Sequence, residues 1–337
     1  KTKEKQKAKE LLASGKAQIA VGTHALISGD VEFSNLALVI TDEQHRFGVV
    51  QRGDLSAKGT HPHTLVMSAT PIPRTLGLII YGDLDISVID EYPRGRGQIE
   101  NYCVESALRT RVFGYIKKHL DEGRQGYIVC PMVEENEEIN IKSAEQYFAE
   151  IQDGEFKNYR VGLLHGKMKP KDKDAVMHSF KDGEIQLLVC TTVIEVGIDV
   201  PNAAIMVIEN AERFGLSQLH QLRGRIGRGQ YKSTCIFISD YKSGATADRL
   251  NVIKNNTDGF KIADEDLRLR GPGDFLGSRQ HGLPSLKIAD IYADNDILRL
   301  AGMAAANLLE QDPKLTKEEN LNLRKEIILM YKRLHEN

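Results

Sequence analysis

The sequence predicts an α/β protein that is built on parallel sheets and ends in a mainly helical C-terminal region. Short apolar runs alternate with amphipathic stretches through most of the chain, which is the pattern of parallel strands covered by helices on both faces. Beyond Asp240 the strand signal fades and helical periodicity replaces it. The first observation predicts the sheets, and the second predicts the helical end.

The candidate strands are short apolar runs, and the run at residues 36–40 is expected to be buried on both faces. A stretch that combines proline, glycine and charge at residues 90–98 reads as a linker between two α/β parts. A second glycine- and proline-rich break, at residues 270–277, interrupts the helical end. The expected strands are residues 18–21, 36–40, 64–67, 126–130, 159–164, 186–190, 204–208 and 234–239.

Length and composition favour a globular chain with more than one domain. The chain has 337 residues, of which 41% are hydrophobic and 27% are charged, enough for two domains with their own cores. It contains no apolar run near the roughly 20 residues that span a bilayer, and no signal-peptide pattern at its start. We therefore expect a cytoplasmic protein without a membrane partner. The net charge is only -2, so contact with nucleic acid would have to come from local basic clusters.

The cysteines give no sign of a metal site. They lie far apart, with no CxxC pair and no histidine partner, which argues against zinc and against a disulfide framework. We expect buried thiols at all four positions, which are Cys103, Cys130, Cys190 and Cys235.

Acidic and polar residues directly follow the expected strand at residues 36–40. Asp42 and Glu43 should therefore lie at the carboxyl edge of a parallel sheet, where ligands of such sheets collect. Asp42 can hold a hydrated Mg²⁺ on nucleotide phosphates, while Glu43 can orient or deprotonate an attacking water. Gln44 and His45 could sense the terminal phosphate. The alternative is a solvated acidic turn at the end of a strand.

Two further segments carry polar chemistry next to apolar runs. Ser68 and Thr70 follow the strand at residues 64–67, and their hydroxyls can bond backbone groups or the acidic loop; ordinary turn chemistry is the alternative. The segment TTVIEVGIDVP at residues 191–201 places polar and acidic residues where pure burial would exclude them. It is predicted to be a loop at a functional edge.

The segment HQLRGRIGRG, at residues 220–229, is more specific. Arg225 and Arg228 are three residues apart, so both can face one side of a helix or of its exit loop. Guanidinium groups suit phosphate oxygens, and the glycines allow the backbone to approach a partner closely. A generic basic surface patch is the alternative.

These residues carry a resemblance to a known family. TDEQH, SAT, TTVIEVGIDVP and QLRGRIGR resemble motifs II, III, V and VI of the superfamily 2 helicases, in the same order and spacing. DEQHRFGVVQR and the tail at residues 258–284 are similar to the RecG family of ATP-dependent DNA helicases, which remodel stalled replication forks by branch migration and fork reversal. The resemblance covers essentially the whole chain.

The resemblance implies two RecA-like lobes with ATP bound between them. Residues 1–90 would be the C-terminal part of the first lobe, 91–97 a linker, 98–240 the complete second lobe, and 241–337 a helical hairpin with a translocation motif and final helices packed on the second lobe. The family has a phosphate-binding GxxxxGK[ST] loop, and this sequence contains none. We therefore expect a carboxyl-terminal fragment, without the family's wedge domain, that hydrolyses little ATP alone.

The resemblance also implies a role for each site residue. Asp42 would bind Mg²⁺, Glu43 would activate water, and Arg225 and Arg228 would approach the phosphates with support from Gln221. Gln44, His45, Gly197 and Asp199 would contact the nucleotide. DNA contact or coupling of hydrolysis to movement is expected of Ser68, Thr70, Arg74, Thr191, Thr192, Arg268, Arg270, Arg279 and Gln280.

The expected partners are branched double-stranded DNA, such as replication forks and Holliday junctions, with single-stranded DNA-binding protein as a further candidate and a monomer as the expected state. Two other classes remain open. A transcription-repair coupling factor would use the same chemistry, although Gln44 and the segment GSRQHGLP argue against it. A stand-alone DNA-binding module without catalysis is the second alternative. The tail arginines could instead form a solvated basic edge, and His24 could be an ordinary loop histidine.

Overall fold

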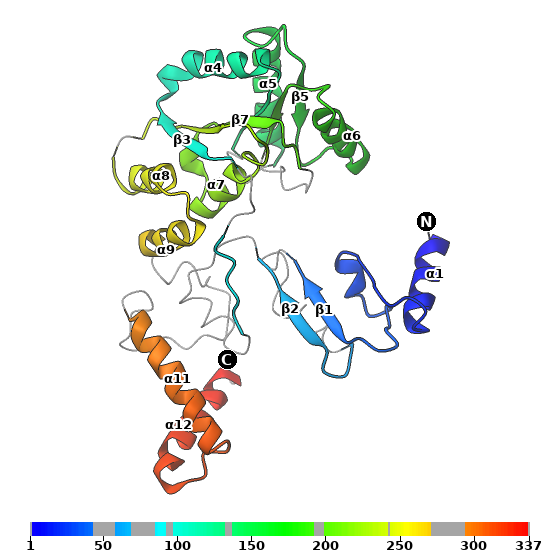
Figure 1. Cartoon of the computed structure of the whole chain (residues 1–337), viewed down its shortest axis with the longest axis vertical. Coiled ribbons are helices and arrows are strands. Elements are labelled where there is room, and N and C mark those ends of the chain that lie inside the picture. The colour runs from blue at the N-terminus through cyan, green and yellow to red at the C-terminus, as the bar shows by residue number, and fades with distance from the viewer. Residues whose placement is uncertain are drawn as a thin grey trace. The chain divides into compact units, whose positions relative to one another are not determined.

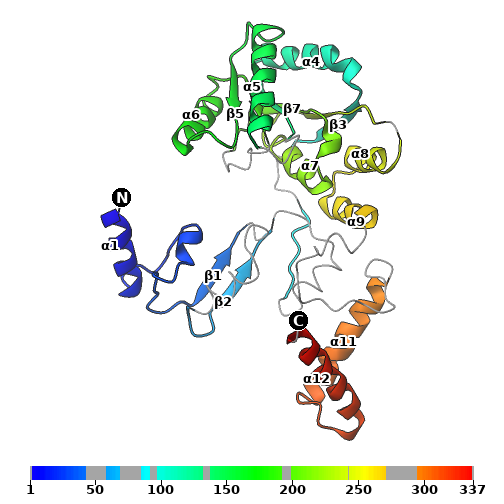
Figure 2. The same ribbon diagram turned by 180° about the vertical axis from the view of Figure 1, so that it is seen from behind.

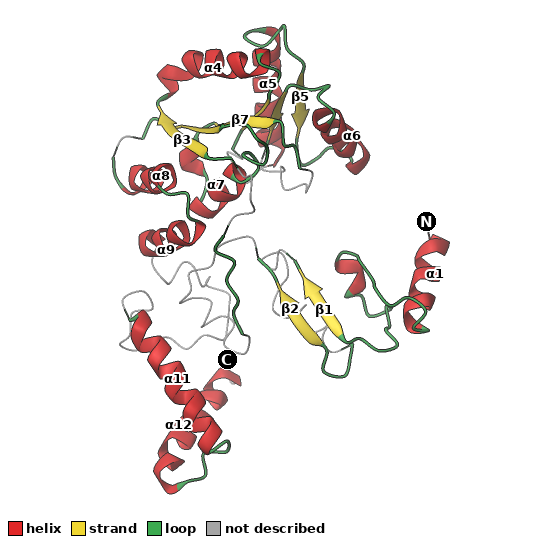
Figure 3. Cartoon of the chain, in the orientation of Figure 1, coloured by secondary structure: helices red, strands yellow, loops and turns green. Residues whose placement is uncertain are grey.

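The structure is a computed structural model that describes residues 2–42, 58–68, 85–91, 97–131, 137–191, 199–241, 243–270 and 294–335. The chain divides into two compact units, Lys1–Pro71 and Ile72–Asn337. Figure 1 shows the elements of each unit by their labels, and Figure 3 separates helices from strands by colour. We describe each unit by itself.

The first unit contains a parallel pair of strands. Helix α1 (Thr2–Ala13) and a short 3-10 helix (His24–Leu26) precede β1 (Leu38–Thr41) and β2 (His63–Val66). The two strands pair in parallel, and Thr41 lies opposite Val66. Two expectations are wrong here. Residues 18–21 form no strand, and β1 is not buried on both faces, because Leu38 and Ile40 are 54% and 56% exposed. In the described part of this unit, β1 pairs only with β2.

The second unit is organised around a six-stranded sheet in the order β3-β8-β7-β4-β6-β5. Every pair of neighbours in this sheet is parallel, as the sequence predicts. The strands are β3 (Ile99–Val104), β4 (Gln125–Val129), β5 (Val161–Leu164), β6 (Leu187–Cys190), β7 (Ala203–Ile208) and β8 (Ser233–Ile238).

Helices cover both faces of this sheet, as Figures 1 and 2 show from opposite sides. One face packs against α4 (Arg109–Asp121) and α5 (Glu137–Asp153), and the other against α6 (Pro170–Lys181) and α7 (Leu216–Arg223). Successive residues of a strand point to opposite faces. Tyr127 therefore packs on the α6 and α7 side, while its neighbour Ile128 packs on the α4 side.

The helical end begins with α8 (Ala245–Asn255) and α9 (Gly259–Arg270), which pack against α7. Further along lie α11 (Asn295–Gln311), a 3-10 helix (Glu318–Asn320) and α12 (Leu321–His335). The turn after α11 is held by Asp312, whose carboxylate accepts hydrogen bonds from the backbone N–H groups of Thr316 and Lys317, each at 2.9 Å. Whether the last two helices pack on the six-stranded sheet stays a prediction.

Most expected elements are present, with small shifts at their ends. Each of the expected strands from residue 36 onward overlaps an observed strand, whereas β3 was not expected. The four cysteines are free: Cys130, Cys190 and Cys235 are buried as predicted, and Cys103 is partly exposed. Burial raises the pKa of the Cys130 thiol to about 12. Within the described ranges, the helices are all too short or too polar to cross a membrane.

Candidate functional site

Two predicted site residues of the first unit lie at one edge of its sheet. Asp42 follows β1 directly, and Ser68 lies two residues beyond the end of β2. The strands stay in register to their ends, where the backbone N–H of Met67 donates to the carbonyl of Thr41 at 2.8 Å. The carboxyl edge of the parallel pair therefore brings together the starts of the acidic and hydroxyl segments. The predicted residues Glu43, Gln44, His45, Thr70 and Arg74 lie outside the described residues.

The arginine-rich segment of the second unit forms the end and the exit loop of α7. The helix begins after Gly215, whose N–H donates to the side-chain oxygen of Gln218 at 3.1 Å, and it ends at Arg223. Arg225 and Arg228 therefore lie in the exit loop. The Nε of Arg228 donates to the Gly224 carbonyl at 3.1 Å, which folds this side chain back over the end of the helix.

Arg228 also meets a residue from the predicted loop at residues 191–201. Its Nη1 atom lies 3.5 Å from Oδ1 of Asp199, and the two side chains are 37% and 53% exposed. Arg228 belongs to the segment QLRGRIGR, and Asp199 belongs to the segment GIDVP. Their ion pair therefore joins two predicted motifs that are separate along the chain. Both charges remain partly accessible to a ligand.

Glycines make this close approach possible. A Cβ at Gly229 would lie 2.2 Å from the carbonyl oxygen of Pro201, a separation that side chains do not tolerate. Gly227 has a φ of +75°, in the left-handed region that favours glycine. Gly229 therefore seats the arginine loop on Pro201, while a Cβ at Gly227 would meet the side chain of Ile99 at 2.8 Å.

The parallel sheet places the two ends of the segment 191–201 at opposite edges. Thr191 follows β6 at the carboxyl edge, where its N–H donates to the Leu164 carbonyl at 3.2 Å. Asp199 precedes β7, so it lies at the amino edge together with the exit loop of α7. One segment therefore connects the two edges of the sheet. The predicted residues Thr192 and Gly197 lie outside the described residues.

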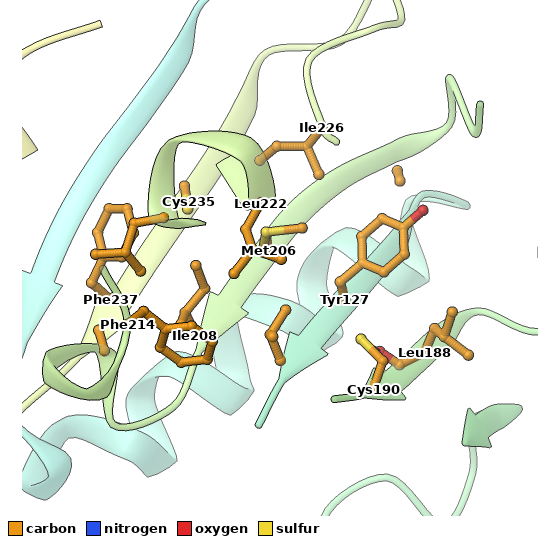
Figure 4. Packing of buried hydrophobic residues seen from close by; sticks show 14 of the residues in the cluster. Tyr127, Leu188, Cys190, Met206, Ile208, Phe214, Leu222, Ile226, Cys235 and Phe237 are labelled. Atoms are coloured by element: carbon orange, nitrogen blue, oxygen red, sulfur yellow. The ribbon is translucent and has the colours of Figure 1, made fainter. Parts of the chain in front are cut away.

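The arginine loop rests on an apolar layer. Figure 4 shows Tyr127, Leu222 and Ile226 among the buried side chains on the α7 side of the sheet. Burial raises the pKa of Tyr127, and the nearby charges of Arg225 and Arg228 oppose that rise.

Arg223 was not among the residues predicted from the sequence, although it is the most buried arginine of this segment. It is only 3% exposed, and its Nη1 atom donates to the carbonyls of Ile253 at 3.1 Å and Asn256 at 2.6 Å. Its Nη2 atom donates to Thr257 at 3.2 Å and lies 2.9 Å from Nδ1 of His220. The spacing held a signal, since residue 223 lies four residues after the buried Leu219 on the apolar stripe of α7.

A second polar contact joins α7 to the helical end. The hydroxyl of Ser217 donates to the carboxylate of Asp266 on α9 at 3.3 Å, and Asp266 is 1% exposed. Gln221, a predicted site residue, is half-buried on α7 between these contacts. The helix that leads into the arginine loop is therefore tied by hydrogen bonds to both α8 and α9.

The predicted tail residues are only partly described. Arg268 lies on α9, where its Nε donates to Glu265 at 2.8 Å and its side chain is 52% exposed. Arg270 is the last residue of α9, and Arg279 and Gln280 lie outside the described residues. Among the residues that the structure describes, no group of three or more histidine, cysteine or acidic side chains is placed to hold a metal ion.

Comparisons with known proteins define the class. The model "Helicase conserved C-terminal domain" matches residues 109–230, and the model "DEAD/DEAH box helicase" matches residues 1–79. The structure of Mycobacterium smegmatis helicase Lhr bound to ssDNA and AMP-PNP is similar in fold, with a TM-score of 0.51 at 15% identity over 69% of this chain and 33% of that one. The fold and motifs are those of a superfamily 2 helicase with RecA-like sheets.

The relatives narrow the class to one family. The ATP-dependent DNA helicase RecG of Bacillus subtilis is 48% identical over 97% of this chain and 48% of its own length, and that of Thermotoga maritima is 49% identical over 88% and 38%. A structure of RecG bound to a three-way DNA junction matches with a TM-score of 0.67 at 46% identity, over 88% of this chain and 38% of that one. The model of RecG domain 3, C-terminal, matches residues 256–335. The chain belongs to the RecG family, and it spans about half the length or less of these relatives.

Proposed function

We propose that the protein acts as an ATP-dependent DNA helicase that moves on branched double-stranded DNA and remodels replication forks and recombination junctions. The observation that carries the proposal is the pairing of the arginine loop with Asp199 at the amino edge of the six-stranded sheet, within segments that resemble helicase motifs V and VI. The proposed partner is branched DNA, and single-stranded DNA-binding protein is a further candidate. The proposed oligomeric state is a monomer.

The proposed division of the chain follows the sheets. Residues 1–90 are assigned to the first lobe, 91–97 to a linker, 98–240 to the second lobe, and 241–337 to the translocation hairpin and final helices. The six-stranded sheet, whose strands run from Ile99 to Ile238, supports the second of these lobes.

In the proposed reaction, the acidic segment after β1 and the arginine loop after α7 contribute different groups. Asp42 would hold the Mg²⁺ that accompanies ATP, and Glu43 would accept a proton from the attacking water. Arg225 and Arg228 place positive charge where negative charge develops on the phosphates, a contribution of roughly 10³ to 10⁵ in rate for arginines of this kind. Mg²⁺ supplies charge neutralisation of the phosphates when it is bound.

The remaining predicted residues are assigned to the nucleotide contact or to its coupling with DNA. Gln44, His45 and Gly197 sense the nucleotide, Asp199 acts at the nucleotide through its ion pair with Arg228, and Gln221 supports the arginines from α7. The hydrogen bonds from α7 to α8 and α9 provide a physical route from the arginine loop to the tail. DNA contact or coupling is assigned to Ser68, Thr70, Arg74, Thr191, Thr192, Arg268, Arg270, Arg279 and Gln280.

The decisive experiment replaces Glu43 with glutamine in the full-length gene product. Glutamine keeps the size of the side chain but cannot accept the proton, so ATP binding should persist while fork-stimulated hydrolysis falls by about 10² or more. Equilibrium binding of ATP and steady-state turnover on a synthetic fork are measured on the same preparation. A parallel loss of binding and turnover would instead make Glu43 an organiser of the metal or of the fold.

One observation favours a second candidate for the chain taken alone. Its 337 residues contain no GxxxxGK[ST] sequence, so they lack the backbone donors, lysine and hydroxyl that such a loop gives to ATP and Mg²⁺. A non-catalytic DNA-binding module is the corresponding function. The 337-residue chain should hydrolyse ATP negligibly on fork DNA, whereas turnover equal to that of a full-length relative would contradict this expectation.

A further inference from the structure

Arg109 is held at the carboxyl edge of the six-stranded sheet by a buried carboxylate. Its Nε and Nη2 atoms donate to the two oxygens of Glu209 at 3.1 and 2.9 Å. The hydroxyl of Tyr147 donates to the same carboxylate at 2.7 Å. Glu209 is only 4% exposed, so this network fixes the guanidinium from beneath.

The outer side of this guanidinium remains available. The Nη1 atom of Arg109 has no partner among the residues that the structure describes, and the side chain is 37% exposed. A guanidinium held by two bonds loses little freedom when it binds again, and its free N–H groups suit a phosphate oxygen. Because Glu209 balances the positive charge of Arg109, a contact between Arg109 and a phosphate would depend on the fixed geometry of the guanidinium group.

A second positive group lies along the same edge, after β5. The turn at residues 165–169 is held by a hydrogen bond from the Met168 N–H to the His165 carbonyl at 3.3 Å, and by the Lys173 ammonium on the Gly166 carbonyl. Lys169 and Lys171 are exposed next to this turn, and no described residue pairs with either ammonium group.

The topology aligns these groups. β7, which Glu209 follows, and β5 are three positions apart in the sheet, a span of about 14 Å at the usual spacing between strands. Thr191 lies between them, at the end of β6. Two carboxylates, Asp172 and Asp174, follow the lysines on α6. The positive charge along this edge therefore lies mainly at the turn at residues 165–169.

We propose that Arg109, Lys169 and Lys171 form a contact between the second unit and the phosphate backbone of duplex DNA. The inference rests on the proposed function, since it names the surface that would hold the DNA. Thr191, already assigned to DNA, lies between these groups at the carboxyl edge. Residues 191–201 connect it to the amino edge, which carries Arg228.

The test compares two double variants with the same change in charge. Lys169→Gln with Lys171→Gln removes the lysines of the carboxyl edge. Lys157→Gln with Lys181→Gln removes two exposed lysines from the other end of β5 and α6, at the amino edge. Binding of the full-length gene product to a labelled synthetic fork is measured by anisotropy across a series of salt concentrations.

We expect the carboxyl-edge variant to bind the fork at least about five-fold more weakly, and the slope of log affinity against log salt to fall by about 2. The control should keep the wild-type affinity and slope. Arg109→Gln should lower the slope by about 1, and the lysine variants test the surface even if this change disturbs the buried Glu209. Equal behaviour of the two double variants would overturn the inference, whereas a wild-type protein that does not bind the fork would overturn the proposed function itself.

Discussion

Arg228 and Asp199 form an ion pair between the exit loop of α7 and the residues that precede β7, with Nη1 and Oδ1 3.5 Å apart. Asp199 and the Gly224 carbonyl together set the direction of the guanidinium. Both side chains are partly exposed, so the pair is a positioning contact and contributes little to stability.

This geometry predicts that Asp199→Asn has a mild effect. Loss of an exposed ion pair is worth at most about 1 kcal/mol, so the turnover number of the full-length gene product should fall no more than about five-fold. Steady-state hydrolysis on fork DNA measures it. A loss of 10² or more would mean that Asp199 acts on the nucleotide directly.

The buried Arg223 predicts a large effect on stability. Arg223→Met removes the donor that satisfies three backbone carbonyls at the start of the helical end, and should cost about 3 kcal/mol in the free energy of unfolding. Urea unfolding followed by circular dichroism measures the change. The exposed Arg111→Met on α4 is the matched control and should stay within about 0.5 kcal/mol. Equal stabilities of the two variants would contradict the role given to Arg223.

Two glycines of the second unit predict opposite responses to alanine. Gly229→Ala places a Cβ 2.2 Å from the Pro201 carbonyl and should destabilise by about 2 kcal/mol or more. Gly114→Ala, inside α4 with open space around the new Cβ, should stabilise by about 1 kcal/mol. The same urea experiment reads both. A neutral Gly229→Ala would show that the arginine loop is not seated on Pro201.

Asp312 predicts a pH dependence in the turn after α11. Hydrogen bonds from Asn320 and from the N–H groups of Lys317 and Thr316 lower the pKa of this carboxyl from 3.8 to about 2. The turn is therefore stabilised above pH 3.8, and this stabilisation is lost as the pH falls toward 2. The amide proton shifts of Thr316 and Lys317, followed by NMR, should titrate with a midpoint near 2. A midpoint at 3.8 would show that the carboxylate does not hold the turn.

The parallel sheet of the second unit could be predicted because its central strands are apolar on both faces. β7, with every residue buried, is the simplest case. β3 was missed because it is an edge strand in which two adjacent polar residues, Glu100 and Asn101, interrupt the apolar pattern directly after a linker-like segment. Residues 18–21 carry an apolar pattern without a partner strand in the described chain, so Ile19 and Val21 remain 84% and 96% exposed.

The position of a candidate residue in the fold was predictable where spacing along the chain decides it. Asp42 and Ser68 share an edge because they end neighbouring parallel strands. The roles of the arginines in QLRGRIGR could not be separated by residue type, since only the phase of α7 directs Arg223 inward and leaves Arg228 in the exit loop. Arg109 was missed because its partner, Glu209, is a hundred residues away along the chain.

In the proposed function, the arginine loop of the second unit acts on ATP. This claim is tested most directly by the rate of fork-stimulated ATP hydrolysis, at saturating ATP, in the full-length gene product carrying Arg228→Lys. Lysine keeps the charge but loses the planar fork, so the rate should fall by about 10³ while ATP affinity changes less than about five-fold. A rate within about ten-fold of the wild-type value would contradict the claim.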